Sequence, residues 1–233
     1  MRAFHALAAA ALVVLSGCTF YLPGDGTETE QRRTVDDFTG VDLGHGVVAT
    51  VTLGPKSVRM SGEGNILDAI RTVVRDGKLV TEVDSNVTLL PTREVHVEIR
   101  TPTLGFVGGF GGAQVTATSA YRSRLEVMAS GASTVAVKEV DADALRVVAS
   151  AASLVTLSGT ARTAVFQLST VRALLKPLVV VDGTLQVSGG TEAEVCVTDE
   201  LNVEISGRST VRIWGNPTVK QVDVSGDSSC TLE

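Results

Sequence analysis

Apolar and polar residues alternate in short stretches along most of this chain, which is typical of β-strands that bury one face. The alternation is clearest in 47–53 (VVATVTL) and 95–99 (VHVEI), where β-branched residues dominate. Asp76-Gly77 lies between two further apolar stretches and predicts a hairpin turn, because glycine tolerates positive φ. For 65–70 (NILDAI) we expect a single helical turn. The chain is therefore predicted to be all-β.

From residue 125 onward the sequence repeats, in segments that align without gaps over thirteen positions. The segments are 125–137, 145–157, 164–176, 185–197, 201–213 and 220–232, and a degenerate copy precedes them around 105–117. A unit of about 19 residues cannot bury its own hydrophobic face, so the copies must stack on one another. This predicts a right-handed parallel β-helix (β-solenoid), with rungs of about 19 residues in the C-terminal half.

Two columns of the alignment are apolar in every segment, and we expect these side chains to point inward. The third position holds Val127, Val147, Phe166, Val187, Val203 and Val222, and the eleventh holds Val135, Val155, Leu174, Val195, Val211 and Cys230. Between the two columns lies a tight turn of small residues, of which Ser130–Ser133 is the fullest form. Each unit is thus predicted to be a strand, a turn and a second strand.

The alignment also predicts details of single rungs. Glu192, Arg208 and Asp227 occupy the turn tips of the last three segments and would form a ladder of alternating charge. Lys176 interrupts an apolar column and Pro177 follows it, so the third rung is expected to bulge there.

The two cysteines of the repeat region are expected to stay unpaired. Cys196 and Cys230 lie two rungs apart, on an outward and an inward column. Two strand spacings are about 9.6 Å, whereas a disulfide tolerates a Cα separation of at most about 7 Å. An exported compartment would permit a disulfide, but the register argues against it. No Cys and His spacing typical of zinc is present, and we predict no cofactor.

The N-terminus has the features of a bacterial lipoprotein signal. Arg2 supplies a basic start, 6–15 is apolar but shorter than the ~20 residues of a membrane span, and Leu15-Ser16-Gly17-Cys18 resembles the lipobox. This predicts removal of residues 1–17 and lipidation of Cys18, which gives stable membrane anchoring. The alternative is an ordinary secretory signal with an incidental cysteine. Thr19 implies sorting to the outer membrane, as in lipoproteins whose signals this one resembles.

Composition separates the rest of the chain into a tether and a folded part. Residues 18–35 are polar and rich in glycine, which predicts a flexible tether. The domain is expected over 36–233, with an N-terminal β part over 36–103 and repeat rungs over 104–233. Apolar residues make up 44% of the chain and aromatics 4%, which suits thin stacked β layers. The formal charge of −6 and the absence of a Lys/Arg block argue against a nucleic-acid partner.

No arrangement typical of nucleophilic catalysis is present in the sequence. His45 lies in a turn-like Gly-His-Gly, and His96 is expected to face solvent from a strand. Glu204 and Asp223 share a column on adjacent rungs and could lie about 5 Å apart, as in a glycan-active enzyme. The rest of that column is Met128, Val148, Gln167 and Ser188, while the aromatics that could stack on sugar, Trp214 and Tyr121, lie elsewhere. The column therefore favours a tolerant, solvent-facing surface over a catalytic pair.

Several short motifs follow one another in a specific order. They are Phe38-Thr39-Gly40-Val41 before VVATVTL, 62–67 (GEGNIL), VHVEI before 101–104 (TPTL), the Ser-Gly-Ala-like turns, and 214–217 (WGNP) before a last Ser-Gly turn. Together they resemble the DUF2807 family, the putative auto-transporter adhesin, head GIN domain, from about residue 36 to 233. The resemblance implies a right-handed β-helix on bacterial surfaces or in the periplasm, often on lipoproteins. It supplies no catalytic or binding residues.

These observations lead to a non-enzymatic envelope lipoprotein, an adhesin-like or scaffold module whose ligand, an envelope protein or a glycan, is open. A glycan-active enzyme using Glu204 and Asp223 is the competing hypothesis. A third is a purely structural subunit, because the last rung exposes strand edges that stacking into a homo-oligomer would cover. The sequence leaves open whether the periplasmic or the surface face of the outer membrane carries the protein.

Overall fold

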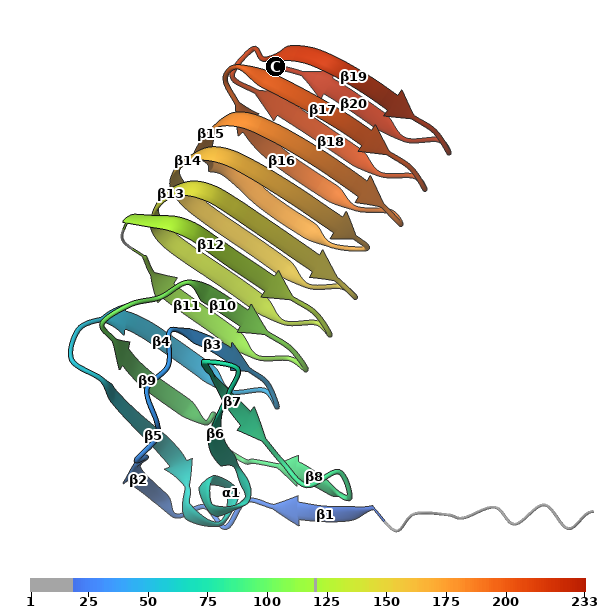
Figure 1. Ribbon diagram of the computed structural model, residues 1–233. Coiled ribbons are helices and arrows are strands. Elements are labelled where there is room, and N and C mark those ends of the chain that lie inside the picture. The colour runs from blue at the N-terminus through green and yellow to red at the C-terminus, as the bar shows by residue number, and fades with distance from the viewer. Residues whose placement is uncertain (1–18, 120) are drawn as a thin grey trace, which may run out of the picture.

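The computed structural model describes residues 19–119 and 121–233 and shows a β-solenoid closed at one end by a cap (Figure 1). Nearly all of its regular structure is strand. Within the described residues, no helix has the length and apolar character needed to cross a bilayer. The β-solenoid predicted from the repeats is confirmed.

Each coil of the solenoid consists of two strands joined by a tight turn. In chain order, the coil strands are β3 (Gly40–Leu43), β4 (Val48–Leu53), β10 (Phe106–Gly109), β11 (Gln114–Thr118), β12 (Tyr121–Ala129), β13 (Thr134–Ser150), β14 (Leu154–Ser169), β15 (Arg172–Ser188), β16 (Glu192–Val197), β17 (Glu200–Ile205), β18 (Thr210–Trp214), β19 (Thr218–Val224) and β20 (Ser229–Leu232). The long strands β13, β14 and β15 each run from the second half of one coil into the first half of the next.

Stacked coils pair in parallel and create two sheets. The first sheet contains β3, β10, β12, β17, β19 and the C-terminal halves of β13, β14 and β15. The second sheet contains β4, β11, β16, β18, β20 and the N-terminal halves of the same long strands.

The solenoid begins earlier in the chain than the repeats predict. The degenerate copy around 105–117 forms β10 and β11, with Val107 beside Val127, so that prediction is confirmed. Below it lies one more coil, β3 and β4, which pairs in parallel with β10 and β11. In the sequence, the segment 54–105 lies between this first coil and the second coil, on which it packs in the structure. A search for regularly spaced repeats therefore does not find the first coil.

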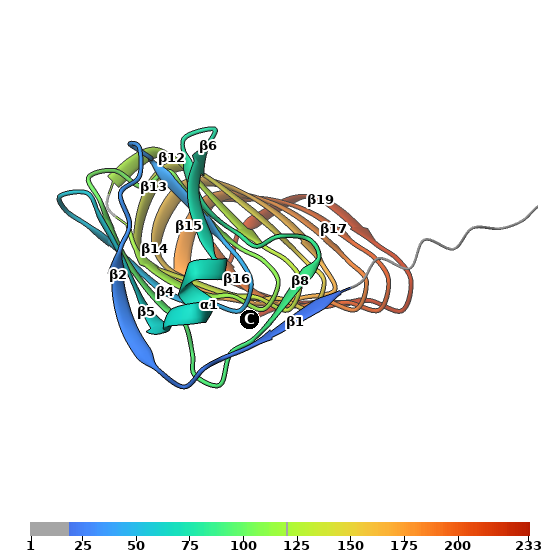
Figure 2. The same ribbon diagram turned by 90° about the horizontal axis from the view of Figure 1, so that it is seen from below.

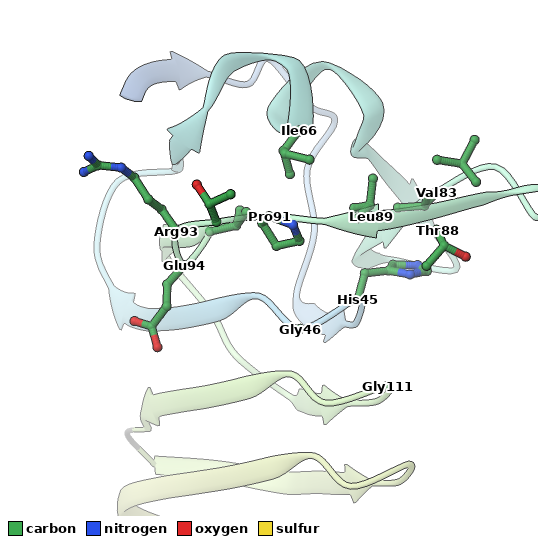
Figure 3. A pocket seen from close by; sticks show the side chains of 13 residues that line it. His45, Gly46, Ile66, Val83, Thr88, Leu89, Pro91, Arg93, Glu94 and Gly111 are labelled. Atoms are coloured by element: carbon green, nitrogen blue, oxygen red, sulfur yellow. The ribbon is translucent and has the colours of Figure 1, made fainter. Parts of the chain in front are cut away.

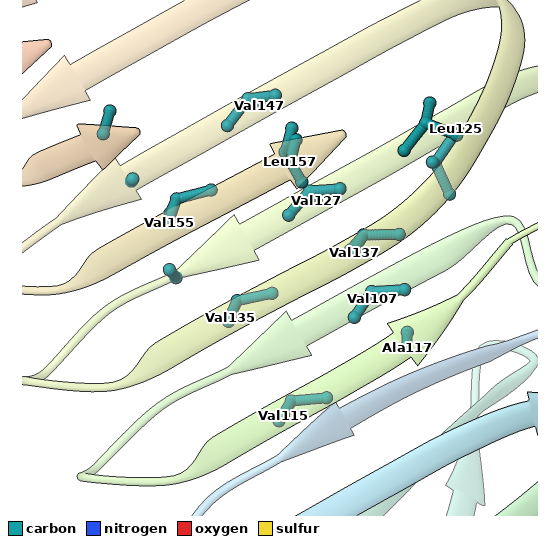
Figure 4. Close-up of a cluster of buried hydrophobic side chains, with 14 of the residues drawn as sticks. Val107, Val115, Ala117, Leu125, Val127, Val135, Val137, Val147, Val155 and Leu157 are labelled. Carbon is teal, nitrogen blue, oxygen red and sulfur yellow. The ribbon is translucent and has the colours of Figure 1, made fainter. Parts of the chain in front are cut away.

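The core is a set of apolar columns that run along the solenoid between the two sheets (Figure 4). The columns include Val107, Val127 and Val147 on the first sheet and Val115, Val135 and Val155 on the second. Parallel pairing places equivalent side chains about 4.8 Å apart, so each valine packs on its counterparts in the neighbouring coils. Each buried valine contributes about 1.5–3 kcal/mol relative to an exposed one.

The predicted register is wrong in the third segment, 164–176. Ala173 instead of Leu174 pairs with Val155, because the turn in this segment is one residue shorter than the turn before it. The shorter turn also moves Val171 from the predicted tip into the core, where it is buried. The gapless alignment cannot represent a turn of different length.

The predicted register is also wrong in the fourth segment. Leu185 instead of Val187 pairs with Val203, and Ala193 instead of Val195 takes the eleventh position. The segment therefore begins two residues earlier than the alignment places it. A shift of two residues keeps every side chain on the same face of a strand, so alternation alone cannot detect it.

The same shift removes Glu192 from the turn tip. Its carboxylate lies in β16, 3.3 Å from Arg172 and 3.8 Å from Arg212. Arg208 and Asp227 remain at turn tips, each with positive φ. The predicted ladder of three alternating charges is therefore wrong.

Two other predictions about single rungs are confirmed. The pairing of β15 with β16 skips from Leu175 to Val179, which places a bulge at Lys176. Cys196 and Cys230 are both free, and they lie in strands that β18 separates.

The turns between the two strands of a coil are stacked in the same way as the strands. Gly131 and Ala132 have φ of 61° and 59°, and Gly207 and Arg208 have φ of 71° and 64°. The peptide N–H of one turn donates to a carbonyl of the next, as from Ala132 to Ala151 at 2.9 Å. Buried hydroxyls at the end of the turns donate to turn or strand carbonyls, namely those of Ser133, Ser153, Thr191 and Ser209. The Ser-Gly-Ala-Ser pattern thus supplies both the backbone freedom and the hydroxyl that a stacked turn requires.

A cap covers the solenoid end at which the described chain begins, and Figure 2 shows helix α1 lying across that end. Its elements are β1 (Phe20–Pro23), β2 (Glu28–Arg32), β5 (Ser57–Glu63), α1 (Gly64–Ala69), β6 (Arg71–Arg75), β7 (Lys78–Glu82), β8 (Val87–Leu90) and β9 (His96–Thr101). The chain β2–β5–β9 is antiparallel, and β9 joins the first coil in parallel with β4. The expected helical turn is α1, which buries Ile66 and Leu67, and the expected Asp76-Gly77 hairpin joins β6 to β7.

The segment 18–35 differs from the flexible tether that its composition predicts. It contains β1, which pairs with β8, and β2, which pairs with β5. Composition is a poor guide here because both strands lie at edges of the cap, where most side chains of β1 and alternate side chains of β2 stay exposed.

The turn geometry makes a prediction about stability. Ala151 has φ of 54° at the position that Gly131 and Gly207 hold in other coils. A left-handed conformation is costly for a residue with a Cβ, so we expect Ala151→Gly to raise the free energy of unfolding by about 0.5–1 kcal/mol. Urea unfolding followed by circular dichroism would measure the change.

The matched variant is Gly207→Ala, whose Cβ would lie 2.8 Å from the backbone nitrogen of Gly189. It should lower the unfolding free energy by more than Ala151→Gly raises it. Equal midpoints for both variants and the parent would show that the turns do not limit stability.

Candidate functional site

The outward face of the first sheet carries an aligned column of side chains that is apolar at β12 and β13 and polar from β14 to β19. The aligned column is Met128, Val148, Gln167, Gln186, Glu204 and Asp223. The alignment predicts Ser188 in this column, but the two-residue shift of the fourth segment puts Gln186 there. With Gln186 in place of Ser188, the last four residues of the column (Gln167, Gln186, Glu204 and Asp223) all carry an amide or a carboxylate.

Four side chains on this face are linked by hydrogen bonds, and we call them the amide row (Arg146, Gln167, Gln186 and Glu204). The Arg146 guanidinium donates to Gln167 Oε1 at 2.5 Å. Gln167 Nε2 donates to Gln186 Oε1 at 3.1 Å, and Gln186 Nε2 donates to Glu204 Oε2 at 3.3 Å. A glutamine amide has two N–H groups and two carbonyl lone pairs, so each keeps hydrogen-bonding capacity for a ligand.

Two hollows adjoin the amide row. The larger has a volume of about 380 Å³ and is lined by Gln167, Gln186, Glu204 and the serines at 150, 169, 188 and 206, with aliphatic residues between them. The smaller, of about 140 Å³, adds Thr184, Asn202 and Gln221. Their polar groups are amides, hydroxyls and a carboxylate, and neither lining includes an aromatic or basic side chain. Such a surface can exchange hydrogen bonds with a polar ligand over several strands.

Glu204 and Asp223 are direct neighbours on β17 and β19, as the sequence predicts. Neighbouring strands are about 4.8 Å apart, close to the 5–5.5 Å between the carboxyl groups of retaining glycosidases. Both residues are exposed to solvent, however, and Glu204 accepts a hydrogen bond from Gln186. A general acid needs an enclosure that keeps it protonated, and the adjoining hollows do not provide one.

The other candidate residues of the sequence are dispersed. His96 is exposed on β9, 3.6 Å from Glu94, as expected for a solvent-facing strand residue. Trp214 ends β18 on the second sheet, away from the carboxylates, with the Lys176 ammonium 4.2 Å from its ring centroid. In the part of the chain that the structure describes, no group of three or more His, Cys, Asp or Glu side chains could hold a metal ion. The predicted lipidation site, Cys18, lies outside the described residues.

A third hollow, of about 640 Å³, lies between the cap and the first coils (Figure 3). Apolar side chains of Ile66, Val83, Val87 and Leu89 line it together with the polar residues His45, Thr88, Arg93 and Glu94. The His45 ring meets Phe110 edge-on at 5.6 Å between centroids, and burial lowers the pKa of His45. At neutral pH this imidazole is therefore uncharged. The hollow thus presents apolar side chains, neutral polar side chains and the charged pair Arg93 and Glu94.

One buried carboxylate holds the wall of this hollow together. Glu63 accepts hydrogen bonds from the N–H groups of Gly26 and Thr92, both at 2.7 Å, and from the Thr92 hydroxyl at 2.7 Å. A longer bond of 3.3 Å comes from the Arg93 N–H. These bonds, led by the Thr92 hydroxyl, lower the pKa of Glu63 although burial acts in the opposite direction. Glu63 therefore joins the N-terminal segment and the β8–β9 loop to the start of α1.

Sequence reasoning does not find Glu63, because its partners are three backbone N–H groups and one hydroxyl that lie far away in the chain. The only local signal is its position between two glycines, which indicates a turn. Gly24 is part of the same arrangement, since a Cβ there would lie 2.0 Å from the Glu63 carboxylate.

Comparison with known proteins adds a family match and several similar folds. The family model described as "Putative auto-transporter adhesin, head GIN domain" (DUF2807) matches residues 37–217. A putative adhesin from Bacteroides fragilis is 18% identical, with a TM-score of 0.79 over 91% of this chain and 98% of that chain. A putative lipid binding protein from Parabacteroides distasonis is 15% identical, with a TM-score of 0.75 over 91% and 99%. At these identities the structural likeness shows a shared fold, and no protein with a curated description matches the chain in sequence.

The Glu63 cluster predicts how stability depends on pH. The folded state lowers the pKa of Glu63 below 4.5, so its contribution is complete above the unfolded pKa and is lost as the pH falls through the folded pKa. We expect Glu63→Gln to be less stable at pH 7 and to show a flatter loss of stability below about pH 5. Urea unfolding at a series of pH values would measure both effects.

The control is Glu30→Gln, which removes a neighbouring carboxylate that pairs with Arg59 on the exposed side of β2. It should leave the acid-induced loss of stability nearly unchanged, because an exposed ion pair contributes little. If Glu63→Gln and Glu30→Gln had the same pH profile, the proposed role of Glu63 would be wrong.

Proposed function

We propose, from the premise that this chain belongs to the DUF2807 family, that it is a non-enzymatic lipoprotein of the bacterial cell envelope. In this proposal the protein is an adhesin-like module that binds a polar ligand through the amide row. The family description and the similar folds support a binding function and a place in the envelope or at the cell surface.

The amide row is the observation that carries the proposal. Its members come from consecutive coils and are held in fixed order by hydrogen bonds, so the surface is preorganised before a ligand arrives. The two hollows beside it offer amide and hydroxyl groups with few charges, which suits a hydroxyl-rich polymer such as an envelope or host glycan. A polymer that follows the solenoid axis could contact several coils in turn.

The glycan-active enzyme remains the competing function, and the direct pairing of Glu204 with Asp223 is the observation in its favour. Their exposure and the purely polar surroundings support binding over catalysis. The two functions also differ in what happens to the glycan. A lectin-like surface binds it and leaves it intact, whereas a glycan-active enzyme cleaves it.

Anchoring rests on the sequence of the signal and its cysteine. Lipidation of Cys18 would place the protein on a membrane, and Thr19 supports the outer membrane as its destination. One similar fold is named a putative lipid binding protein, which is compatible with a membrane location for proteins of this shape.

The binding proposal is tested with the detergent-solubilised protein on a printed array of bacterial and host glycans. The double variant Gln167→Ala/Gln186→Ala should bind any glycan that the parent retains about tenfold more weakly, because two hydrogen bonds contribute about 0.5–1.5 kcal/mol each. Gln114→Ala is the control, since Gln114 is an exposed glutamine on the second sheet. Equal binding by all three proteins would place the ligand elsewhere. Release of sugar fragments by the parent and not by Glu204→Gln/Asp223→Asn would establish the enzyme instead.

Surface display makes a separate prediction. In an adhesin-like role the solenoid faces the medium, so protease added to intact cells should remove the full-length protein. A periplasmic protein of known location is the control and should survive until the outer membrane is permeabilised. Protection of this protein to the same point would replace the adhesin-like role with that of an envelope scaffold.

A further inference from the structure

The strand pair β1–β8 forms a ribbon at the outer end of the cap, and we call it the β1–β8 ribbon (Phe20–Pro23 and Val87–Leu90). Among the described strands, β1 pairs only with β8, in a two-stranded parallel sheet that is separate from the solenoid. None of the eight residues is charged. Figure 1 shows the ribbon at the opposite end of the molecule from the C-terminus.

The ribbon exposes large apolar side chains that the fold does not need there. Phe20 is 59% exposed, Tyr21 61% and Leu90 47%. Phe20 and Tyr21 are neighbours in one strand and therefore point to opposite faces of the ribbon. Tyr21 shares the outer face with Leu90, which pairs with Pro23, and Phe20 lies on the face of Leu22 at the exposed start of the strand.

The ribbon is also held firmly in place. The Phe20 N–H donates to the Asn86 carbonyl at 2.7 Å, and the Gly24 N–H donates to the Leu90 carbonyl at 3.0 Å. The side chain of Leu22 packs against the core from the inner face. The exposed residues are consequently presented by a fixed strand and not by a loose terminus.

The position of the ribbon in the chain explains what covers it. Thr19 is the single residue between Cys18 and β1. Phe20 and Tyr21 are two and three residues from Cys18, which span at most about 7 and 11 Å, so a lipid attached to Cys18 holds both side chains close to the membrane surface. Aromatic rings with an apolar body and a polar tip are favoured at membrane–water interfaces.

We propose that the β1–β8 ribbon inserts Phe20, Tyr21 and Leu90 into the interfacial layer of the lipid bilayer and so fixes the orientation of the whole protein. The inference rests on the lipid anchor at Cys18. The ribbon supplies a second, non-covalent contact beside the acyl chains, and the solenoid projects away from the membrane. The amide row and the last coil are then displayed at a distance from the lipid.

A bilayer accounts for the ribbon better than a protein partner does. A protein interface would be expected to bring charged and hydrogen-bonding groups at its rim, whereas none of the eight ribbon residues is charged and only Tyr21 and Thr88 carry a side-chain hydroxyl. The opposite end of the solenoid also exposes apolar residues, Val222 and Leu232 at 60% each, but it lies at the other end of the molecule from the β1–β8 ribbon. That end serves as the internal control.

The experiment uses the full lipidated protein reconstituted into phosphatidylcholine vesicles. Trp214 is the only tryptophan of the chain, so Trp214→Phe gives a silent background for fluorescence. Tyr21→Trp reports on the ribbon and Val222→Trp on the opposite end. We expect brominated lipids to quench the Tyr21→Trp emission about twofold or more, because an interfacial side chain lies about 5–10 Å deep in the headgroup–acyl boundary. The Val222→Trp emission should stay unchanged.

The outcomes separate the anchor from the ribbon. If the variants float with the vesicles and neither is quenched, the anchor stands and the ribbon proposal is wrong. If both are quenched equally, the protein lies along the bilayer and the proposed orientation is wrong. A blue-shifted but unquenched Tyr21→Trp emission would show that the ribbon is covered by protein, from the same or a second copy of this chain, and would also overturn the proposal. If the protein fails to float, the anchor and the ribbon contact fall together.

Discussion

Parallel stacking at one strand spacing is the constraint on which the rest of this structure depends. Each coil must offer a similar inward side chain at each column, because the neighbouring coils lie only about 4.8 Å away. The turn must repeat as well, since its N–H groups bond to carbonyls of the next turn. A left-handed pair of residues meets this requirement in most turns, which explains the recurrence of glycine where a Cβ would touch the turn below.

A stack of this kind needs an end, and the chain builds one by interrupting the repeat. After the first coil, the segment 54–105 leaves the solenoid and folds into the cap before the second coil begins. The cap contains few of the long apolar columns that stabilise the coils, so specific polar contacts matter more for the stability of the cap. Glu63 supplies the central one, because a single carboxylate satisfies N–H groups from the N-terminal segment and from the β8–β9 loop.

The sequence predicts the solenoid well because its signal is repeated many times, and it predicts the cap poorly because each cap contact occurs once. The third and fourth segments show the limit within the repeat itself. In the third segment the shorter turn exchanges the inward and outward residues of the following strand, and in the fourth a two-residue shift keeps them on the same faces. In both, the correct register depends on the turn and not on the strands. The same shift hides the amide row, since Gln186 joins Gln167 and Glu204 only in the true register. The paired carboxylates were predictable because they lie in segments whose register is regular.

Repetition also determines what this architecture can do. A side chain that recurs on an outward column becomes a continuous row, so substitutions in separate coils combine into one extended surface. Gln167, Gln186 and Glu204 form such a row because amides can donate to one neighbour and accept from the other, and Arg146 joins it from the neighbouring outward column. A lone catalytic centre gains nothing from this arrangement, whereas a binding surface gains length with every coil. The direction of the solenoid then matters, because in a membrane-anchored protein a row that runs along the axis stays fully accessible when one end of the axis is fixed and the rest projects away from the membrane.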